Sequence, residues 1–476
     1  MKYPFLKWRK LFNIDNSLIG YKEVILLTEV PEGYIGIYNL DDLLAVANNM
    51  AGNYIQMNDL DLTNSGEWTA LVGPPNGLID NTYDGNGYAI IGLTGEGIFT
   101  GTHSTGIIKN LRVVNADTGG NGAIIKQYHE GKIINCYVSG NSCISPGNWE
   151  NGEICYCTVD VNIVSEYNSG GICTDNYAEI KYCNSIGSIN ITNGDAGGLV
   201  VGNYSNIHNC FSNCDVTAKY KAGGFIANSY SSIPIKNCYA TGNVTSTGTT
   251  VDNASAGGFI VHTGTEGSIE DCYATGAVMS NGRYAAGLVC YLQCPILRSF
   301  ARGNITGNAE HAGGFIAFTD YTSNIKQCFS TGNVTGKRYV GGFTGTGWEA
   351  PIEDCYALGS VTSETNESVG GFMGMGDCAL KNCYSIGKVN GSGINVGGLI
   401  GWQYLAWVGT GIVTNCYYNM ETSYQDDTMK GIPKTTLEMY SQSTYENWDF
   451  DSVWEMPEIA LTRIKHRGKI VGNLLL

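Results

Sequence analysis

The sequence predicts an all-β fold, a parallel β-helix of about a dozen coils with small helical caps at each end. First, a short unit recurs, as in AGGFIANSYSSIPIKNCYATGNV from residue 222 and AGGFIVHTGTEGSIEDCYATGAV from residue 256. Second, the apolar runs in each unit are short, rich in β-branched residues and bounded by Gly, Asn, Ser or Thr, which is typical of strands and turns. Third, no unit is long enough to be a domain, so successive units must stack to bury their apolar side chains.

Two columns of equivalent residues define the repeat between residues 92 and 420. Members of the first column lie 21 to 34 residues apart, mostly 26 to 29. They are Leu111, Cys136, Cys157, Cys183, Cys210, Cys238, Cys272, Ser299, Cys328, Cys355, Cys383 and Cys416. The second column is a glycine pair, and its first members are Gly170, Gly197, Gly223, Gly257, Gly313, Gly341, Gly370 and Gly397.

An aliphatic residue three positions before each column cysteine predicts a bend. Ile269, for example, precedes Cys272, and Glu270 and Asp271 lie between them. In a flat strand, residues three apart point to opposite faces, so one of the polar residues would face the core. A bend between the two lets the isoleucine and the cysteine both face the core. Bent coils stacked in this way form a parallel β-helix.

The cysteines are predicted to form a buried column of reduced thiols. Leu111 and Ser299 occupy the same position as the cysteines, which fits packing and does not fit metal ligation. Stacked neighbours would hold their Cβ atoms about 4.8 Å apart, beyond the ~3.8 Å of a disulfide. The count of 17 is also odd. Reduced structural thiols are compatible with assembly in a bacterial cytoplasm.

Composition excludes several classes of protein. Charged residues make up 15% of the chain and hydrophobic residues 43%, which does not fit a disordered chain. The net charge of −16 argues against binding to nucleic acid or to anionic membranes. No apolar run reaches the roughly 18 residues of a membrane span. The basic start MKYPFLKWRK is not followed by the apolar stretch of a secretion signal.

A helix is expected at the N-terminal end of the array, because a solenoid must cover its terminal coils. In NLDDLLAVANNM, Asn39 is the expected N-cap. Leu40, Leu43, Leu44 and Ala47 are expected on the buried face of this helix.

A second cap is expected at the C-terminal end. Thr435 and Glu438 have the spacing of a capping box at the start of a short helix. Trp448, Phe450 and Trp454 are large enough to plug the last coil, and we expect them there.

The unit GGFI…IKNCYATGNV resembles the GLUG-motif repeat of bacterial surface proteins, adhesins and phage-encoded proteins. The segment that starts IYNLDDLLAVANNM resembles the one that precedes such repeats, and KTTLEMYSQSTYENWDFDSVWEM resembles the one that closes them. The resemblance covers most of the chain. It implies a right-handed β-helical stalk exposed outside a cell or on a virion, and it implies no catalytic residues. The expected parts are an attachment segment (1–33), an N-terminal cap (34–91), the repeats (92–420) and a C-terminal cap and tail (421–476).

We expect a virion component that contacts the host cell, such as a tail fibre or a tailspike-like protein. Secreted members of the family begin with a signal peptide and often continue into an anchor, and neither is evident here, whereas phage particles leave their host by lysis. The expected partners are a glycan or polysaccharide of the host surface and, through residues 1–33, other tail proteins. The main alternative is a bacterial adhesin, on the cell surface or secreted. A second alternative is a polysaccharide depolymerase.

A stripe of aromatic residues is predicted in the loop six residues after the glycine pair. Its positions are Tyr128, Tyr177, Tyr204, Tyr230, Gly264, Gln293, Asp320, Trp348, Asp377 and Tyr404. Aromatic faces beside carboxylates and amides suit sugar rings. The candidate ligand-binding residues are Tyr204, Tyr230, Tyr321, Trp348 and Tyr404. The alternative is that the stripe only packs the loops of adjacent coils.

A second aromatic column directly follows the cysteines. It contains Tyr137, Phe211, Tyr239, Tyr273, Phe300, Phe329, Tyr356, Tyr384 and Tyr417. Because side chains alternate along a strand, this column should point away from the core. It would pack under loops or be buried between the subunits of a homo-oligomer.

Catalytic residues are not evident in the sequence. Asp320 and Asp377 are two coils apart in one column, about 9.6 Å by strand spacing, which is near the carboxylate separation of inverting glycosidases. Aspartate is also common in turns, so this pair is a weak candidate. The six histidines are scattered and show no zinc-ligand spacing. We therefore expect no metal and no cofactor.

Overall fold

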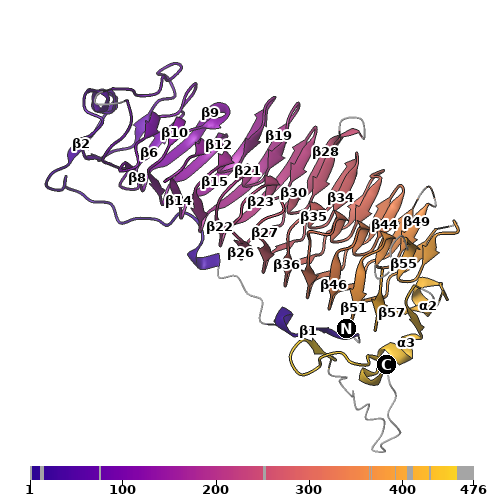
Figure 1. Ribbon diagram of the computed structural model, residues 1–476. Helices are drawn as coiled ribbons and strands as arrows, with labels where there is room; N and C mark the ends of the chain where they lie inside the picture. The colour runs from indigo at the N-terminus through magenta and orange to yellow at the C-terminus, as the bar shows by residue number, and fades with distance from the viewer. Residues whose placement is uncertain are drawn as a thin grey trace, which may run out of the picture.

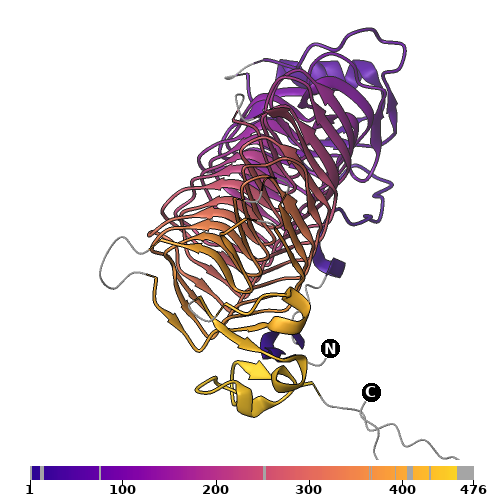
Figure 2. The same cartoon turned by 90° about the vertical axis from the view of Figure 1, so that its right-hand side faces the viewer.

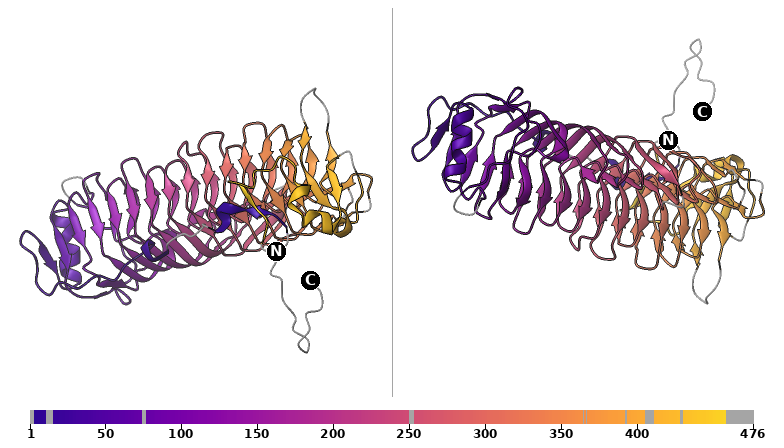
Figure 3. Two further views of the ribbon diagram at one scale, coloured as in Figure 1. Left: turned by 90° about the horizontal axis from the view of Figure 1, so that it is seen from below. Right: turned by 90° about the horizontal axis from the view of Figure 1, so that it is seen from above.

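Successive coils of the chain stack into one long solenoid, and their strands form four parallel sheets along it (Figure 1). The computed structural model describes residues 3–10, 16–73, 77–249, 253–363, 365, 367–391, 393–404, 411–427 and 430–457. Figure 3 shows the coils side by side along the whole length of the rod. The prediction of an all-β parallel β-helix is confirmed.

One coil, residues 311–336, illustrates the architecture. The chain enters through β39 (His311–Gly313), turns at the glycine pair and continues as β40 (Ile316–Thr319). A loop leads to β41 (Ile325–Lys326), and after a sharp corner the chain continues as β42 (Phe329–Ser330) and β43 (Val334–Gly336). We call the sheet containing β41 sheet 1, that of β42 and β43 sheet 2, that of β39 sheet 3 and that of β40 sheet 4.

Sheet 1 is the longest, with 15 strands from β2 (Ile35–Ile37) to β56 (Val413–Thr414), and sheet 3 has nine. The ten strands of sheet 4, which position the candidate site, are β13 (Ser145–Asn148), β17 (Cys173–Asn176), β21 (Val200–Asn203), β25 (Ile226–Ser229), β30 (Ile260–Thr263), β35 (Val289–Leu292), β40, β45 (Thr344–Gly347), β50 (Met373–Gly376) and β55 (Ile400–Gln403). Equivalent residues pair directly, as Ile325 does with Ile352. Side chains of one column therefore lie directly above one another. Figure 2 shows the strands of successive coils stacked side by side.

The predicted bend is a single residue in the left-handed conformation, immediately before each column cysteine. Its φ lies between 46° and 55° in all twelve coils. The corner residues are Asn110, Asn135, Tyr156, Tyr182, Asn209, Asn237, Asp271, Arg298, Gln327, Asp354, Asn382 and Asn415. Asn and Asp tolerate this conformation better than other non-glycine residues, which explains their number here. The corner turns sheet 1 into sheet 2 and directs the isoleucine and the cysteine inward, as the spacing of three predicted.

The column cysteines satisfy the backbone at the corner as well as filling the core. The Cys136 and Cys157 N–H groups donate to the Sγ of the equivalent cysteine in the next coil, each at 3.4 Å. The Cys272 N–H donates to the Ser299 Oγ at 3.2 Å in the same way. All 17 cysteines are free and buried. A side-chain acceptor is therefore useful at this position, which explains why serine can replace cysteine there.

The glycine pair gives room to neighbouring backbone. A Cβ on the first glycine would overlap the carbonyl oxygen three residues later, as at Gly313 and Ile316. A Cβ on the second glycine would overlap the carbonyl oxygen of its equivalent in the next coil, as at Gly314 and Gly342. The following phenylalanine enters the core, where Phe343 stacks on Phe372 with ring centroids 4.7 Å apart.

The N-terminal end is closed by α1 (Leu40–Ala45) and a 3-10 turn (Val46–Asn48), and the Asn39 side chain caps α1 as predicted. One predicted buried residue is wrong, since Leu44 is 47% exposed. The helix tightens after Ala45, so Val46 and Met50 join Leu43 in the core instead. Strands β2, β3 (Tyr54–Gln56) and β5 (Thr82–Asp84) already belong to sheet 1, so regular stacking begins within residues 34–91.

The C-terminal segment contains α2 (Met420–Ser423), α3 (Thr436–Met439) and a 3-10 turn (Gln442–Thr444). The predicted capping box of Thr435 and Glu438 is present. Trp448 and Trp454 are buried, but they lie against the outer face of sheet 2 and do not plug the last coil. The last coil is already extended by β58 (Ile432–Lys434), which pairs with β57 (Tyr417–Asn419), so the tryptophans cover another apolar surface.

That surface is the second aromatic column. From Phe211 to Tyr384 its rings stack with centroids 4.7 to 5.2 Å apart. Leu6, Trp448 and Trp454 pack on its C-terminal part. The column is therefore covered by the two terminal segments of the same chain where it lies beside the last coils.

The N-terminal segment runs along the solenoid from the last coils toward the first (Figure 1). We call residues 3–10 and 16–27 the strap. Its β1 (Phe5–Leu6) pairs with β59 (Trp454–Glu455), and two 3-10 turns follow (Lys7–Lys10 and Asn16–Leu18). The Gly20 N–H then donates to the carbonyl of the corner residue Tyr182 at 2.8 Å. Within the described residues, no helix is long and apolar enough to cross a bilayer.

Replacing Gly314 by Ala should destabilise the rod. The new methyl group would overlap the Gly342 carbonyl, and overpacking of this kind costs about 1–3 kcal/mol. Gly264→Ala is the matched control, because its Cβ would meet Tyr230 atoms at 3.4 Å and the Ser229 carbonyl oxygen at 3.7 Å, which are ordinary contacts. We expect a lower guanidinium midpoint for Gly314→Ala and an unchanged or slightly higher one for Gly264→Ala. Equal midpoints would contradict the steric role of the glycine pair.

Stability should fall in acid because of buried His129 at the end of β10 (Ile125–His129). Its Nδ1 accepts a hydrogen bond from Thr102 Oγ1 at 2.8 Å and its Nε2 donates to the Glu153 carbonyl at 3.3 Å. Burial lowers its pKa from 6.5 to about 4. The unfolded chain therefore takes up the proton first, and stability, complete above pH 6.5, is lost as the pH falls toward 4.

The expected loss from His129 alone is about 3 kcal/mol. Thermal melts of the wild type and of His129→Gln between pH 7.5 and pH 4.5 would measure it. The variant should melt lower at neutral pH but lose less stability on acidification. A pH dependence as steep as that of the wild type would show that the histidine does not contribute.

Candidate ligand-binding surface

The predicted aromatic stripe exists as one column in the turn after sheet 4. Its members donate their backbone N–H to the last strand residue of the preceding coil, as Tyr204 does to the Asn176 carbonyl at 2.8 Å and Tyr230 to the Asn203 carbonyl at 2.7 Å. The Trp348 and Tyr404 N–H groups donate in the same way to the preceding coil, to the Thr319 and Gly376 carbonyls, at 3.0 Å each. The backbone register thus brings four of the five candidate binding residues into one row, which we call the site column.

Tyr128 is out of register with this column. It lies within β10 and pairs with Gly101. The carbonyl of the next residue, His129, accepts a hydrogen bond from the backbone N–H of the column member in the following coil. That position is Trp149, which the sequence pattern did not identify because its coil has lost the glycine pair. The signal that could have found it is the asparagine preceding it, since Asn148, Asn176 and Asn203 occupy one position.

The N-terminal half of the site column is a continuous stack of rings. Trp149 and Tyr177 have centroids 4.9 Å apart and planes within 5°. Tyr177 and Tyr204 are 4.5 Å apart within 3°, and Tyr204 and Tyr230 are 5.7 Å apart at 28°. The interior residues beneath them form an amide ladder, in which Asn148 donates to Asn176 and Asn176 donates to Asn203, each at 2.8 Å. A buried polar ladder and an exposed aromatic ladder therefore hold this edge in one geometry.

Polar side chains lie beside the stacked rings. The Lys221 ammonium donates to Asn228 Oδ1 at 2.6 Å, and the Asn228 amide donates to Asp195 Oδ2 at 3.4 Å. Burial, with neighbouring Tyr177 and Asp175, raises the pKa of Tyr204. Burial, with Tyr204 and Asp195, raises the pKa of Tyr230. Both phenols are therefore protonated at neutral pH and can donate a hydrogen bond.

Stacking limits what the rings can offer to a ligand. The faces of Tyr177 and Tyr204 lie against neighbouring rings, so edges and hydroxyl groups remain available. Tyr204 is 42% exposed and Tyr230 45%. Tyr230 differs from the others because the next column member is Gly264, so no ring stacks on its second face. The nearest ring in that coil is His262, tilted by 52° with centroids 5.7 Å apart. A planar or apolar ligand surface can stack there.

The column is interrupted for three coils after Tyr230, and we call Gly264, Gln293 and Asp320 the column gap. Four strand spacings separate Tyr230 from Trp348, about 19 Å. Within the gap, Gln293 Nε2 donates to Asp320 Oδ2 at 3.0 Å. Tyr321 projects beside it and is 72% exposed.

A second outward stack flanks the gap. His262 and Tyr291 have centroids 5.0 Å apart, and Tyr291 and Phe318 are 4.9 Å apart. Burial lowers the pKa of His262 to about 4, and the nearby Lys221 adds to this effect. This imidazole is therefore neutral at physiological pH. Beyond the gap, Trp348 meets Tyr404 edge to face at 5.7 Å.

The two candidate carboxylates are engaged within turns. Asp320 accepts from the Thr322 N–H at 3.1 Å and from the Thr322 hydroxyl. Asp377 is only 2% exposed, and its Oδ1 accepts from the Glu349 N–H at 2.8 Å. Both carboxylates therefore stabilise turns by accepting backbone N–H hydrogen bonds. Among the described residues, no three His, Cys, Asp or Glu side chains are grouped as a metal site would require.

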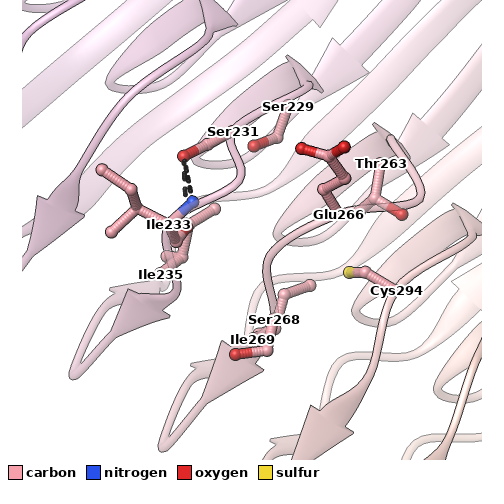
Figure 4. A pocket seen from close by; sticks show the side chains of 9 residues that line it. All are labelled: Ser229, Ser231, Ile233, Ile235, Thr263, Glu266, Ser268, Ile269 and Cys294. Atoms are coloured by element: carbon pink, nitrogen blue, oxygen red, sulfur yellow. Dashed lines mark hydrogen bonds between the residues drawn. The ribbon is translucent and has the colours of Figure 1, made fainter.

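The site column borders a cavity too small for a ligand (Figure 4). It has a volume of about 10 Å³ and lies between the coils of Ser229 and Thr263, which is the size of a single water molecule. Ser231 shapes its wall by accepting from the Ile233 N–H at 3.0 Å. Binding at this edge would therefore be to an open surface.

Comparisons with known proteins give short matches. No family model matches the chain. A putative Gly-rich membrane protein of Evansella cellulosilytica is 41% identical over 110 residues, which are 22% of this chain and 12% of that protein. Halomucin of Haloquadratum walsbyi is 33% identical over 120 residues, which are 22% of this chain and 1% of that protein. The chain thus spans a small part of the length of either relative.

Among solved structures, an IgA1 protease aligns with 90% of this chain and 26% of its own, at 13% identity and a TM-score of 0.21. A superposition this loose supports no conclusion about function. The short sequence matches and the fold together describe a β-helical repeat protein with similarity to a Gly-rich protein.

Removing one ring from the stack should test whether it stabilises the edge. Tyr177→Ala removes two stacked contacts, each of about 0.5–1.5 kcal/mol, and should lower the unfolding midpoint. Tyr177→Phe keeps the ring and should leave the midpoint unchanged. If both variants have the same unfolding midpoint as the wild type, stacking contributes nothing to stability.

Proposed function

We propose that this chain is a surface-exposed β-helical shaft that binds polysaccharide along the site column. The observation that carries the proposal is the row of exposed rings in fixed register beside carboxylate, amide and ammonium groups. The apolar face of a sugar can stack on an aromatic ring while its hydroxyls bond to polar neighbours. The column gap is the centre of this proposed site, because Tyr230 at one end has a face on which no ring stacks and Trp348 lies at the other.

The proposed setting is a virion tail, where the shaft would contact a glycan of the host surface and the N-terminal segment would reach other tail proteins. The resemblance of the repeats to the GLUG motif supports a surface role. A second candidate, a bacterial cell-surface adhesin, is favoured by the match to a protein named as a membrane protein. Quantifying the chain in purified phage particles and in the producing cell's surface fraction separates the two.

Binding to a glycan array tests the site. Tyr230→Ala and Trp348→Ala should each weaken a bound glycan about tenfold or more, since loss of a stacked ring removes about 1–2 kcal/mol and a hydrogen bond is lost with Tyr230. Gly264→Tyr should also weaken binding, because the new ring would cover the open face of Tyr230. Tyr167→Ala, at a tyrosine outside the column that is more exposed than Tyr230 (72% against 45%), is the control. Array signals equal to the wild type for all three column variants would reject the site.

A further inference from the structure

A groove separates the strap from the outer face of sheet 2 beside the first coils. It has a volume of about 620 Å³, within the range of small-molecule sites. Tyr21, Glu23, Val24 and Leu26 of the strap line one wall. Gly87, Arg112, Val114 and Tyr137 of the solenoid line the other.

Two asparagines fix the strap above this groove. Asn135 Oδ1 accepts from the Lys22 N–H at 2.7 Å, and its Nδ2 donates to the Lys22 carbonyl at 3.0 Å. Asn86 holds Leu27 in the same two-point manner, at 2.8 and 3.0 Å. Both asparagines are in the left-handed conformation, which turns their amides toward the strap. Residues 23–26 therefore bridge between two fixed points, and the groove beneath them is preformed.

Space under the bridge depends on Gly87. A Cβ there would lie 2.6 Å from Val24 Cγ2 and 3.0 Å from Leu26 Cδ2. Its φ of +80° also favours glycine. The glycine thus lets the strap pass close at one side while the groove stays open toward Arg112 and Tyr137.

Arg112 is the chemical centre of the groove. Arg112 is half-buried, and no described residue forms an ion pair with its side chain or accepts a hydrogen bond from it. Arg112 pairs in register with Tyr137 of the next coil, and the Tyr21 ring packs against the Tyr137 ring, with centroids 6.1 Å apart and planes at 59°. The Tyr137 hydroxyl donates to Asp160 Oδ2 at 3.5 Å. The charge of Arg112 acts on both phenols, and Glu23 acts on Tyr21 from the strap. A guanidinium beside two tyrosine rings, with no ion-pair partner among the described residues, is suited to a carboxylate attached to a ring-shaped body.

We propose that this groove binds an acidic saccharide, with the carboxylate of a uronic or sialic acid residue on Arg112. The tyrosine rings would contact the sugar body, and the Glu23 carboxylate would accept hydrogen bonds from its hydroxyls. The chain carries a net charge of −16, so the local guanidinium and not the overall field must hold the anion. This site lies on sheet 2, apart from the site column on sheet 4, and does not depend on the function proposed there.

Titration calorimetry of the full chain with an oligoglucuronate, its carboxyl-reduced neutral form and inorganic phosphate tests the proposal. We expect saturable binding of the oligoglucuronate. The affinity for the neutral form should be at least about tenfold lower. Arg112→Gln should remove this preference. Val114→Trp, which fills the groove without changing charge, should abolish binding.

Arg338→Gln is the charge-matched control, because Arg338 pairs with Glu367 on another side of the rod, and it should bind as the wild type does. Tyr230→Ala should also bind normally, which separates this site from the site column. Equal affinity for the acidic and neutral forms, unchanged binding by Arg112→Gln, or no saturable binding would overturn the proposal. Phosphate that competes fully with the saccharide would mark a small-anion site and would likewise overturn it. Circular dichroism confirms that each variant is folded.

Discussion

The left-handed corner before each column cysteine is the constraint on which the remaining structure depends. It allows two inward residues to be separated by only two others, so a coil of fewer than thirty residues can close around a core. It also leaves a backbone N–H that the sheets do not use, and the next cysteine Sγ accepts from it. The corner side chains face outward, and Asn135 and Tyr182 supply the groups that hold the strap. Core, column and strap thus follow from one backbone conformation.

Much of the fold could be predicted because the same residue spacing recurs in every repeat. The spacing of three between Ile269 and Cys272 required a bend, and the recurrence of that spacing required stacking. The terminal segments carry no such repetition. Trp448 and Trp454 were expected over the last coil, yet they cover the outer face of sheet 2, because their partners Tyr356 and Tyr384 are brought there only by the completed solenoid. Contacts between residues hundreds of positions apart leave no local pattern in the sequence.

The site column was predictable for the same reason as the core, and its chemistry was less so. Counting from the glycine pair placed Tyr204, Tyr230, Trp348 and Tyr404 in one row. The count failed at Trp149, where the pair is lost, and at Tyr128, where β10 has an irregular register. Sequence alone left open whether these aromatic residues face a ligand or pack between adjacent coils. The ring spacing of 4.5 Å between Tyr177 and Tyr204 means that neighbours cover each other's faces, so the interruption at Gly264 matters more than the number of rings.

A shaft of this kind separates folding from recognition more completely than a globular domain does. Inward positions are coupled through the core, where one added methyl group meets backbone of the next coil. Outward positions repeat at about 4.8 Å and each touches its own neighbours in the row, so one contact can change without moving the others. An extended polymer laid along such a row would meet several modest contacts at once, and their combined effect on affinity exceeds that of any one. The rigidity that the corners impose therefore lowers the entropy lost on binding, and this is the physical reason that a solenoid edge suits a long, flexible ligand.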